Sequence, residues 1–146
     1  MKNKKLSSMD VVNEVDVLLS NAVLEPEGWF DYYEDVAIRK ATAFNDDDWL
    51  AIKNLWPVKD DAWQMKFAGL LGGVNYELAI PILEEMVIKG STGVVSEALN
   101  SLNNMDGDDY FFIPKNEMAE QLQHLYKTEQ HTIKKQTIAS LLSRIK

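Results

Sequence analysis

The chain has 146 residues, a hydrophobic fraction of 46%, a charged fraction of 26% and a formal net charge of −8. This length favours one domain over residues 1–146, and the composition is that of an ordinary globular protein and not of a disordered one. Because the chain has no cysteine, disulfides, thiolate metal sites and thiol nucleophiles are all excluded.

The N-terminal segment predicts a cytoplasmic location. MKNKKLSSMDVVNEVD begins with basic residues, but Asp10, Asn13, Glu14 and Asp16 stand where a signal peptide needs an apolar run. No uncharged apolar stretch approaches the roughly 20 residues that cross a bilayer. Together with the lack of cysteine, these features predict a cytoplasmic protein that does not interact with membranes.

Apolar residues recur at helical spacing along nearly the whole chain, and the alternation typical of strands is absent. Residues suited to N-caps, such as Asn45 and Asp60, precede the apolar runs, and Gly28, Gly72 and Gly73 stand at expected helix ends. The pattern therefore predicts an all-α fold. Its expected helices span residues 9–24, 29–43, 46–56, 61–72, 76–89, 92–104, 115–127 and 131–145.

Every second expected helix carries a similar apolar pattern. When Val36, Trp63, Val94 and Ile133 are set in register, the repeat spacings are 27, 31 and 39 residues, the last lengthened by the insertion MDGDDYFFIP. One helix pair cannot bury its own apolar face, so the pattern predicts about four degenerate, stacked pairs of antiparallel helices. In these helices the residues expected to be buried are Val36, Ala41, Phe44, Phe67, Ala68, Leu71, Ala98, Leu99, Leu102, Ile138 and Leu141.

Two stretches resemble HEAT repeats. PILEEMVIKGSTGVVSEALNSL has the length and apolar spacing of such a motif and begins at Pro81, where HEAT repeats accommodate a bend in their first helix. DDAWQMKFAGLLG is similar to a second HEAT helix, with Asp60 as the turn aspartate and Gly72 at its end. The chain departs from the family pattern because Gln64 and Val95 replace an arginine early in the second helix. The resemblance implies a right-handed HEAT-like α-solenoid, and an irregular helical bundle is the alternative.

The acidic residues are clustered along the chain. Residues 25–61 contain ten acidic side chains against four basic ones, so a nucleic-acid partner, which needs Lys and Arg, is not expected. The clusters 46–48 and 60–61 are expected at two successive helix starts, where the helix dipole favours acids. A helix of about ten residues, or ~15 Å, separates them, which excludes a shared catalytic or metal site. Trp49 and Trp63, one position into these helices, are expected in the core.

No motif supports catalysis or a cofactor. In DGDDYFFIPKNE, Asp106, Asp108 and Glu117 match positions one, three and twelve of a calcium-binding loop, but Phe111 stands where the sixth position needs glycine. The phosphate-binding, dinucleotide-binding, nucleophile-elbow and metalloprotease motifs are also absent from the sequence. We therefore expect neither an enzyme nor a bound metal or cofactor.

A small acidic helical protein without a catalytic motif is expected to bind another protein. In size, charge and expected architecture, the chain resembles the immunity proteins with which bacteria neutralise toxins, including those of contact-dependent growth inhibition. The resemblance implies a monomer that forms a 1:1 heterodimer with a cognate basic nuclease toxin and occludes its active site, steered by complementary charge. A HEAT-like scaffold for another cellular protein is the alternative. A HEAT-like DNA glycosylase is disfavoured, because it should carry a basic groove.

The expected contact surface has two parts, both rich in carboxylates. One is the edge formed by the first two helix pairs, with Trp56 as an aromatic anchor. The other is the inserted segment MDGDDYFFIP, since long loops in compact arrays tend to carry function. A solvated acidic edge without a partner explains the same charges and stays open. The expected partner-binding residues are Asp31, Glu34, Asp35, Trp56, Asp60, Asp61, Asp106, Asp108, Asp109 and Tyr110.

Overall fold

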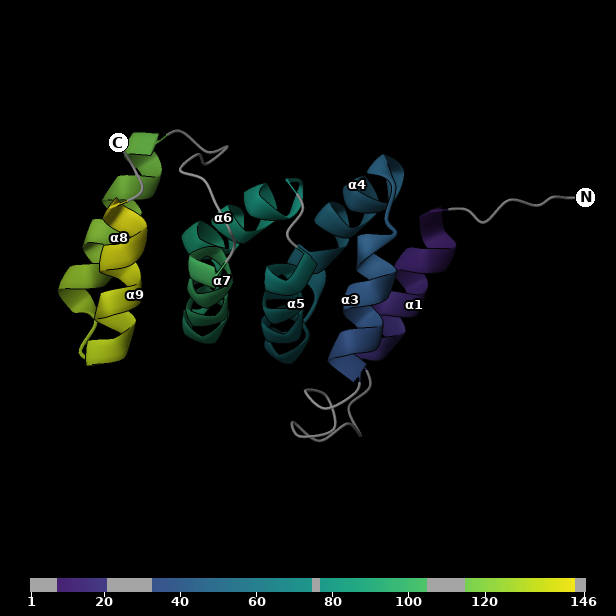
Figure 1. Cartoon of the computed structure of the whole chain (residues 1–146), viewed down its shortest axis with the longest axis horizontal. Helices are drawn as coiled ribbons and strands as arrows, with labels where there is room; N and C mark the ends of the chain where they lie inside the picture. Colours follow the sequence, from purple (N-terminus) through teal and green to yellow (C-terminus); the bar gives the residue numbers. More distant parts are fainter. Residues whose placement is uncertain (1–7, 21–32, 75–76, 105–114, 144–146) are drawn as a thin grey trace, which may run out of the picture.

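The computed structural model describes residues 8–20, 33–74, 77–104 and 115–143, and every regular element within these ranges is helical. The all-α prediction is therefore confirmed, and the helices are arranged as Figure 1 shows. In chain order they are α1 (Ser8–Ser20), α3 (Glu34–Thr42), α4 (Asp46–Leu55), η2 (Trp56–Val58), α5 (Asp61–Val74), α6 (Ala79–Lys89), α7 (Thr92–Asn104), α8 (Lys115–Thr128) and α9 (Thr132–Ser143). None of these helices is long and apolar enough to span a membrane.

The starts of α4 and α5 are set by polar side chains, as the sequence predicts. Asn45 and Asp48 form a capping box: the Asp48 N–H donates to Asn45 Oδ1 at 2.8 Å, and the Asn45 N–H donates to Asp48 Oδ2 at 2.9 Å. At α5, the Trp63 N–H donates to Asp60 Oδ1 at 2.9 Å. These bonds satisfy backbone donors that have no acceptor inside the helix. The two acidic clusters therefore begin two successive helices.

The predicted end of α5 at Gly72 is wrong, because the helix continues through both glycines to Val74. A Cβ atom on Gly72 would lie 2.7 Å from Ser101 Oγ of α7, and one on Gly73 would lie 2.7 Å from Ile38 Cδ1 of α3. Both distances are shorter than a carbon atom tolerates. The two glycines therefore mark the places where neighbouring helices approach α5, and they do not end it.

Pro81 lies in the first turn of α6, which begins at Ala79 instead of the predicted residue 76. The first four N–H groups of a helix have no intrahelical acceptor, so a proline costs little there. No bend is needed to accommodate Pro81. This proline therefore does not strengthen the resemblance to a HEAT repeat.

The contacts between helices follow the predicted pairing only in part. The helices α3, α5, α7 and α9 each pack against the next, and α1 packs on α3, α6 on α7 and α8 on α9 (Figure 1). By contrast, α4 packs against α1 and η2 and makes little contact with its expected partner α5. It is also not closely packed against α6. The second predicted pair thus departs from a regular antiparallel hairpin.

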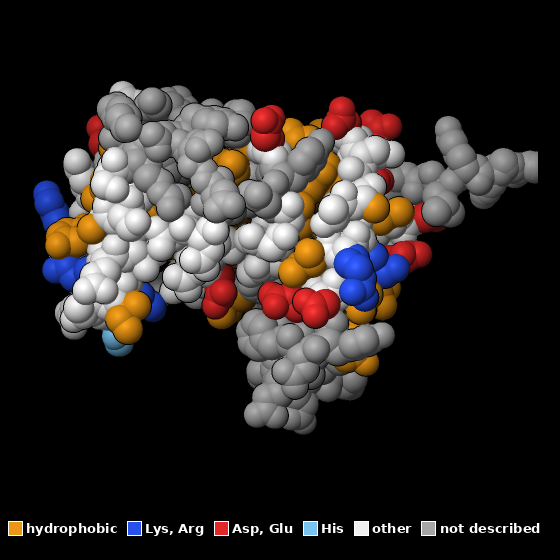
Figure 2. Space-filling view, in the orientation of Figure 1, with side chains coloured by type: hydrophobic (Ala, Val, Ile, Leu, Met, Phe, Trp, Pro, Cys, Tyr) orange, Lys and Arg blue, Asp and Glu red, His pale blue; other side chains and the backbone are white. Residues whose placement is uncertain are grey.

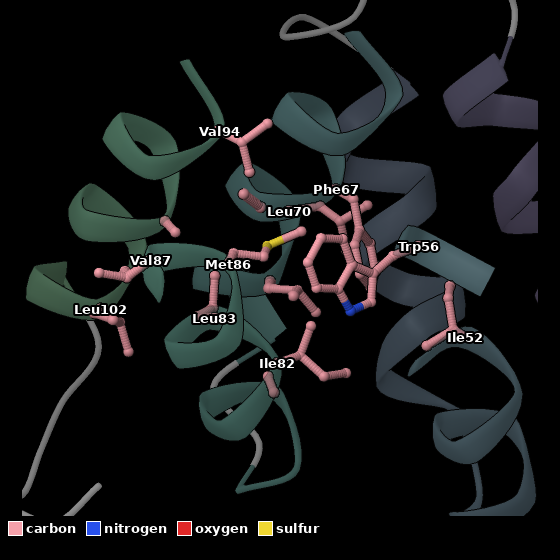
Figure 3. Close-up of a cluster of buried hydrophobic side chains, with 14 of the residues drawn as sticks. Ile52, Trp56, Phe67, Leu70, Ile82, Leu83, Met86, Val87, Val94 and Leu102 are labelled. Atoms are coloured by element: carbon pink, nitrogen blue, oxygen red, sulfur yellow. The ribbon is translucent and has the colours of Figure 1, made fainter. Parts of the chain in front are cut away.

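One apolar cluster includes buried residues from all eight described α-helices. Figure 3 shows its centre, where side chains from α4, η2, α5, α6 and α7 meet. All of the predicted buried residues are buried except Val36. The inward face of α3 is formed by Ala37 and Ala41, four residues apart, which leaves Val36 at its flank. Ile133, set in register with Val36, is 77% exposed, so the first position of the repeat is not buried in α9, whereas the later positions Ile138 and Leu141 are.

Trp56 is a core residue, so its ring is not available as the aromatic anchor of a contact surface that the sequence suggested. Its side chain is only 3% exposed, and it lies near Ile52, Phe67 and Ile82 (Figure 3). The cause is helical spacing, because Trp49, Ile52 and Trp56 follow one another at intervals of three and four residues and share one inward face. Trp49 and Trp63 are buried, as predicted.

Gln64, which replaces the arginine of the HEAT pattern, is also buried. Its Nε2 donates to the carbonyl oxygens of Trp56 at 2.9 Å and Lys59 at 3.1 Å. Buried amides need such partners, and here the partners lie at the two ends of η2. Gln64 therefore ties α5 to the turn that precedes it.

Candidate functional site

The described residues include half of the predicted contact surface. Asp31, Asp106, Asp108, Asp109 and Tyr110 lie outside them, so the inserted segment stays a prediction. Of the remainder, Asp35, Asp60 and Asp61 are exposed, and Glu34 is partly buried. Asp60 caps α5, which accounts for its position without a partner protein.

The structure brings Glu34 together with Glu97, a residue that the sequence analysis did not single out. Glu34 is the first residue of α3, and Glu97 lies in α7. Both carboxylates reach Gly69 of α5: a Cβ atom on this glycine would lie 3.6 Å from Glu34 Oε2 and 3.7 Å from Glu97 Oε1. Helices α3, α5 and α7, which pack side by side in this order, thus bring the two carboxylates close to Gly69.

Both of these carboxyl groups have a raised pKa. Burial is the main cause at Glu34, and the negative charges of Asp35 and Glu97 raise its pKa further. Burial also raises the pKa of Glu97, although the positive charge of Lys134 partly offsets it. Neither glutamate forms a salt bridge within the described part of the chain. Ionising them at neutral pH therefore destabilises the fold, and a cation beside them would remove this cost.

We refer to Glu34, Asp35 and Glu97 as the carboxylate cluster. Asp35 follows Glu34 on α3 and is exposed, so it extends the negative charge to the surface. Figure 2 shows acidic side chains gathered across the face formed by α5 and α7. Glu97 is the one charged residue of α7, in the sequence TGVVSEALNSLNN. A lone carboxylate on an otherwise uncharged helix was the available sequence signal for this residue.

Asp16 shows how an acid with a purely structural role differs from this cluster. Its Oδ1 accepts hydrogen bonds from Lys59 Nζ at 3.0 Å, Trp63 Nε1 at 2.9 Å and Ser20 Oγ at 3.0 Å. Burial alone would raise the pKa of Asp16, but these hydrogen bonds and the Lys59 charge outweigh it and lower the pKa. Asp16 is thus satisfied within the fold and links α1 to α5.

No group of three or more His, Asp or Glu side chains among the described residues could hold a metal ion. The carboxylate cluster has two partly buried groups and one exposed group, which suits the side chain of a lysine or arginine from a partner.

Comparisons with known proteins identify no family for this chain. No protein-family model matches it, and the searches of curated proteins and of solved structures find no match.

Proposed function

We propose that this chain is a HEAT-like helical immunity protein of the cytoplasm, which binds and neutralises a cognate basic toxin. The single observation that carries the proposal is the carboxylate cluster. Glu34 and Glu97 are partly buried on either side of Gly69, have raised pKa values and form no salt bridge within the described residues. Charges that cost stability and serve no internal contact are typical of binding sites.

A basic toxin would supply the missing positive charge. Nuclease toxins carry lysine and arginine side chains that hold phosphates, and these side chains are complementary to a carboxylate cluster. The net charge of −8 would steer such a toxin toward the surface at long range. Once bound, one Lys or Arg between Glu34 and Glu97 would form short, charge-assisted hydrogen bonds with both. A 1:1 complex of this kind would cover the active site of the toxin.

The toxin is sought in the gene next to the one that encodes this chain. Its product is expressed with and without this protein, and the affinity between the two is measured by biolayer interferometry. We expect protection from toxicity, and the double variant Glu34→Gln/Glu97→Gln should weaken binding by about tenfold or more. The matched control is Glu117→Gln/Glu120→Gln, which removes the same charge from two exposed positions on α8.

The control separates a local contact from the overall charge. If both double variants weaken binding equally, the net charge alone explains the interaction and the carboxylate cluster is not the contact site. If the neighbouring gene product is neither bound nor neutralised by the wild-type chain, the proposed function is wrong.

A further inference from the structure

An apolar groove of about 390 Å³ lies between α4 and α6. Trp49 and Leu50 of α4 line one wall, and Leu78, Pro81 and Ile82 line the other. Figure 2 shows apolar side chains exposed in the region between these two helices. Leu50 is 59% exposed and Leu78 is 38% exposed, so two large apolar side chains face water at this point.

The groove exists because α4 and α6 are not closely packed. Helix α4 has apolar side chains on two sides: Trp49 and Ile52 face the core, whereas Leu50 faces outward. The volume is in the range of roughly 300–1,000 Å³ that is typical of binding pockets. The volume of the groove is larger than one side chain of this protein would fill. Its apolar surface is exposed to water, and a bound partner would bury that surface.

The two ends of the groove carry opposite charge. Asp46 lines one end, and Lys53 lines the other, seven residues or ~10 Å further along the same face of α4. Asp47 follows Asp46, and Glu77 precedes Leu78 across the groove; both are exposed. Asn45 and Asp48 already cap α4. None of these three acids, nor Lys53, forms a salt bridge within the described residues.

We propose that this groove binds an amphipathic helix of the basic partner protein. An apolar side chain of that helix inserts between Leu50 and Leu78, and a lysine or arginine lies beside Asp46, Asp47 and Glu77. The proposal rests on the proposed function only for the identity of the partner. The groove favours a helix over a small ligand because its charged groups stand at the two ends and do not converge on one point.

The test is an NMR titration of the full-length, 15N-labelled chain with three designed helical peptides of about four turns. The first has two leucines four residues apart and lysines around them. The second replaces the lysines by glutamates, and the third replaces the leucines by serines. The first peptide should shift the amides of residues 46–53 and 78–82 in a saturable way. The other two should bind about tenfold or more weakly.

Variants of the chain locate the binding site. Leu50→Asn should weaken binding of the lysine peptide by about tenfold, since it removes an apolar wall of the groove. The control Ile133→Asn changes an exposed apolar residue of α9 in the same way and should leave binding unchanged. Glu34→Gln/Glu97→Gln should leave the saturable shifts of residues 46–53 and 78–82 in place, because neither glutamate lines the groove. A failure of the groove can thus be distinguished from a failure of the carboxylate cluster.

Four outcomes would overturn the proposal. They are the absence of saturable shifts in residues 46–53 and 78–82, equal binding of the lysine and glutamate peptides, and equal binding by the Leu50→Asn chain. In the fourth, the NMR signals of the same amides shift when the concentration of the chain alone is raised, and adding the lysine peptide does not reverse these shifts. That result would assign the groove to a second copy of the chain.

Discussion

Asp16 shows at the scale of one residue how the tertiary structure gives a carboxylate its role. Its three hydrogen bonds lower its pKa below the ordinary value of 3.8, so the ionised form stabilises the folded state. Asp16→Asn should lower the free energy of unfolding at pH 7 by about 1–3 kcal/mol, since Lys59 loses its charged partner. Glu14→Gln on the same helix breaks only an exposed pair with Lys40 and should change it by less than about 1 kcal/mol.

The pH dependence of the Asp16→Asn effect is a second measurement on the same variant. A carboxyl group whose pKa is lower in the folded state than in the unfolded state stabilises the fold at pH values above its unfolded pKa. This stability is lost as the pH falls through its folded pKa. Urea unfolding at several pH values should therefore show the difference between wild type and Asp16→Asn shrinking below about pH 3.8. A difference that stays constant down to pH 2 would show that the Asp16 charge is not responsible.

Glu34 and Glu97 should have the opposite pH dependence. Their pKa values are raised above 4.5, so the folded state binds their protons more tightly than the unfolded state. The stability that they cost at neutral pH should be recovered as the pH falls through the raised values toward 4.5. Glu34→Gln/Glu97→Gln should therefore be more stable than wild type at pH 7, by less than about 1 kcal/mol for each residue. Urea unfolding at pH 7 and pH 4.5 tests this, and a less stable double variant at pH 7 would contradict it.

The contact between α5 and α7 depends on a missing side chain. In a helix interior, Gly→Ala ordinarily stabilises by roughly 0.5–1 kcal/mol. At Gly72 the added carbon would lie 2.7 Å from Ser101 Oγ and 3.1 Å from Ser101 Cα, and the backbone atom cannot move aside by a change of rotamer. Ser101 Oγ is also held by its hydrogen bond to the Ala68 carbonyl at 2.6 Å. Gly72→Ala should therefore destabilise the chain, by about 1–3 kcal/mol.

Gly69 supplies the matched control within the same helix. Its added carbon would meet nothing closer than the Glu34 carboxylate at 3.6 Å, which is ordinary van der Waals contact. Gly69→Ala should therefore leave thermal stability unchanged or slightly raised, whereas Gly72→Ala lowers the melting temperature. Equal melting temperatures for the two variants would show that α7 does not approach α5 as closely as the structure places it.

At the scale of the whole molecule, charge should control the rate of association with a basic partner. Asp35→Lys and Asp61→Lys together reverse two exposed charges, each with an effect on stability of about 0.5 kcal/mol or less. Asp60 is kept, because losing its cap would cost about 1 kcal/mol. Stopped-flow mixing with the toxin should show slower association for this variant at low salt. The difference should largely disappear near 1 M salt, where screening acts within about 3 Å. An unchanged association rate at low salt would exclude these positions from the steering surface.

Local signals in the sequence were sufficient to predict the helices. Asn45 and Asp60 stand before apolar runs of helical period, and capping depends only on residues within one turn. The range of α7, residues 92–104, was also predicted without error. Burial of Phe67, Ala68 and Leu71 followed as well, since a helix that has an apolar side buries it against whatever neighbour is available.

The packing partners, by contrast, were decided only by the tertiary structure. The spacing of Trp56 after Trp49 and Ile52 gives it an inward position, but only the packing shows that its ring is enclosed. Gly72 has the appearance of a helix end until Ser101 is placed beside it. Glu34 and Glu97 are 63 positions apart in the sequence, and they meet because α3, α5 and α7 pack in that order. The sequence by itself determined where the helices form and which side of each is apolar, because both depend on neighbours within a few residues. The tertiary structure alone decided which side chains meet across helices, because such contacts depend on how distant segments pack.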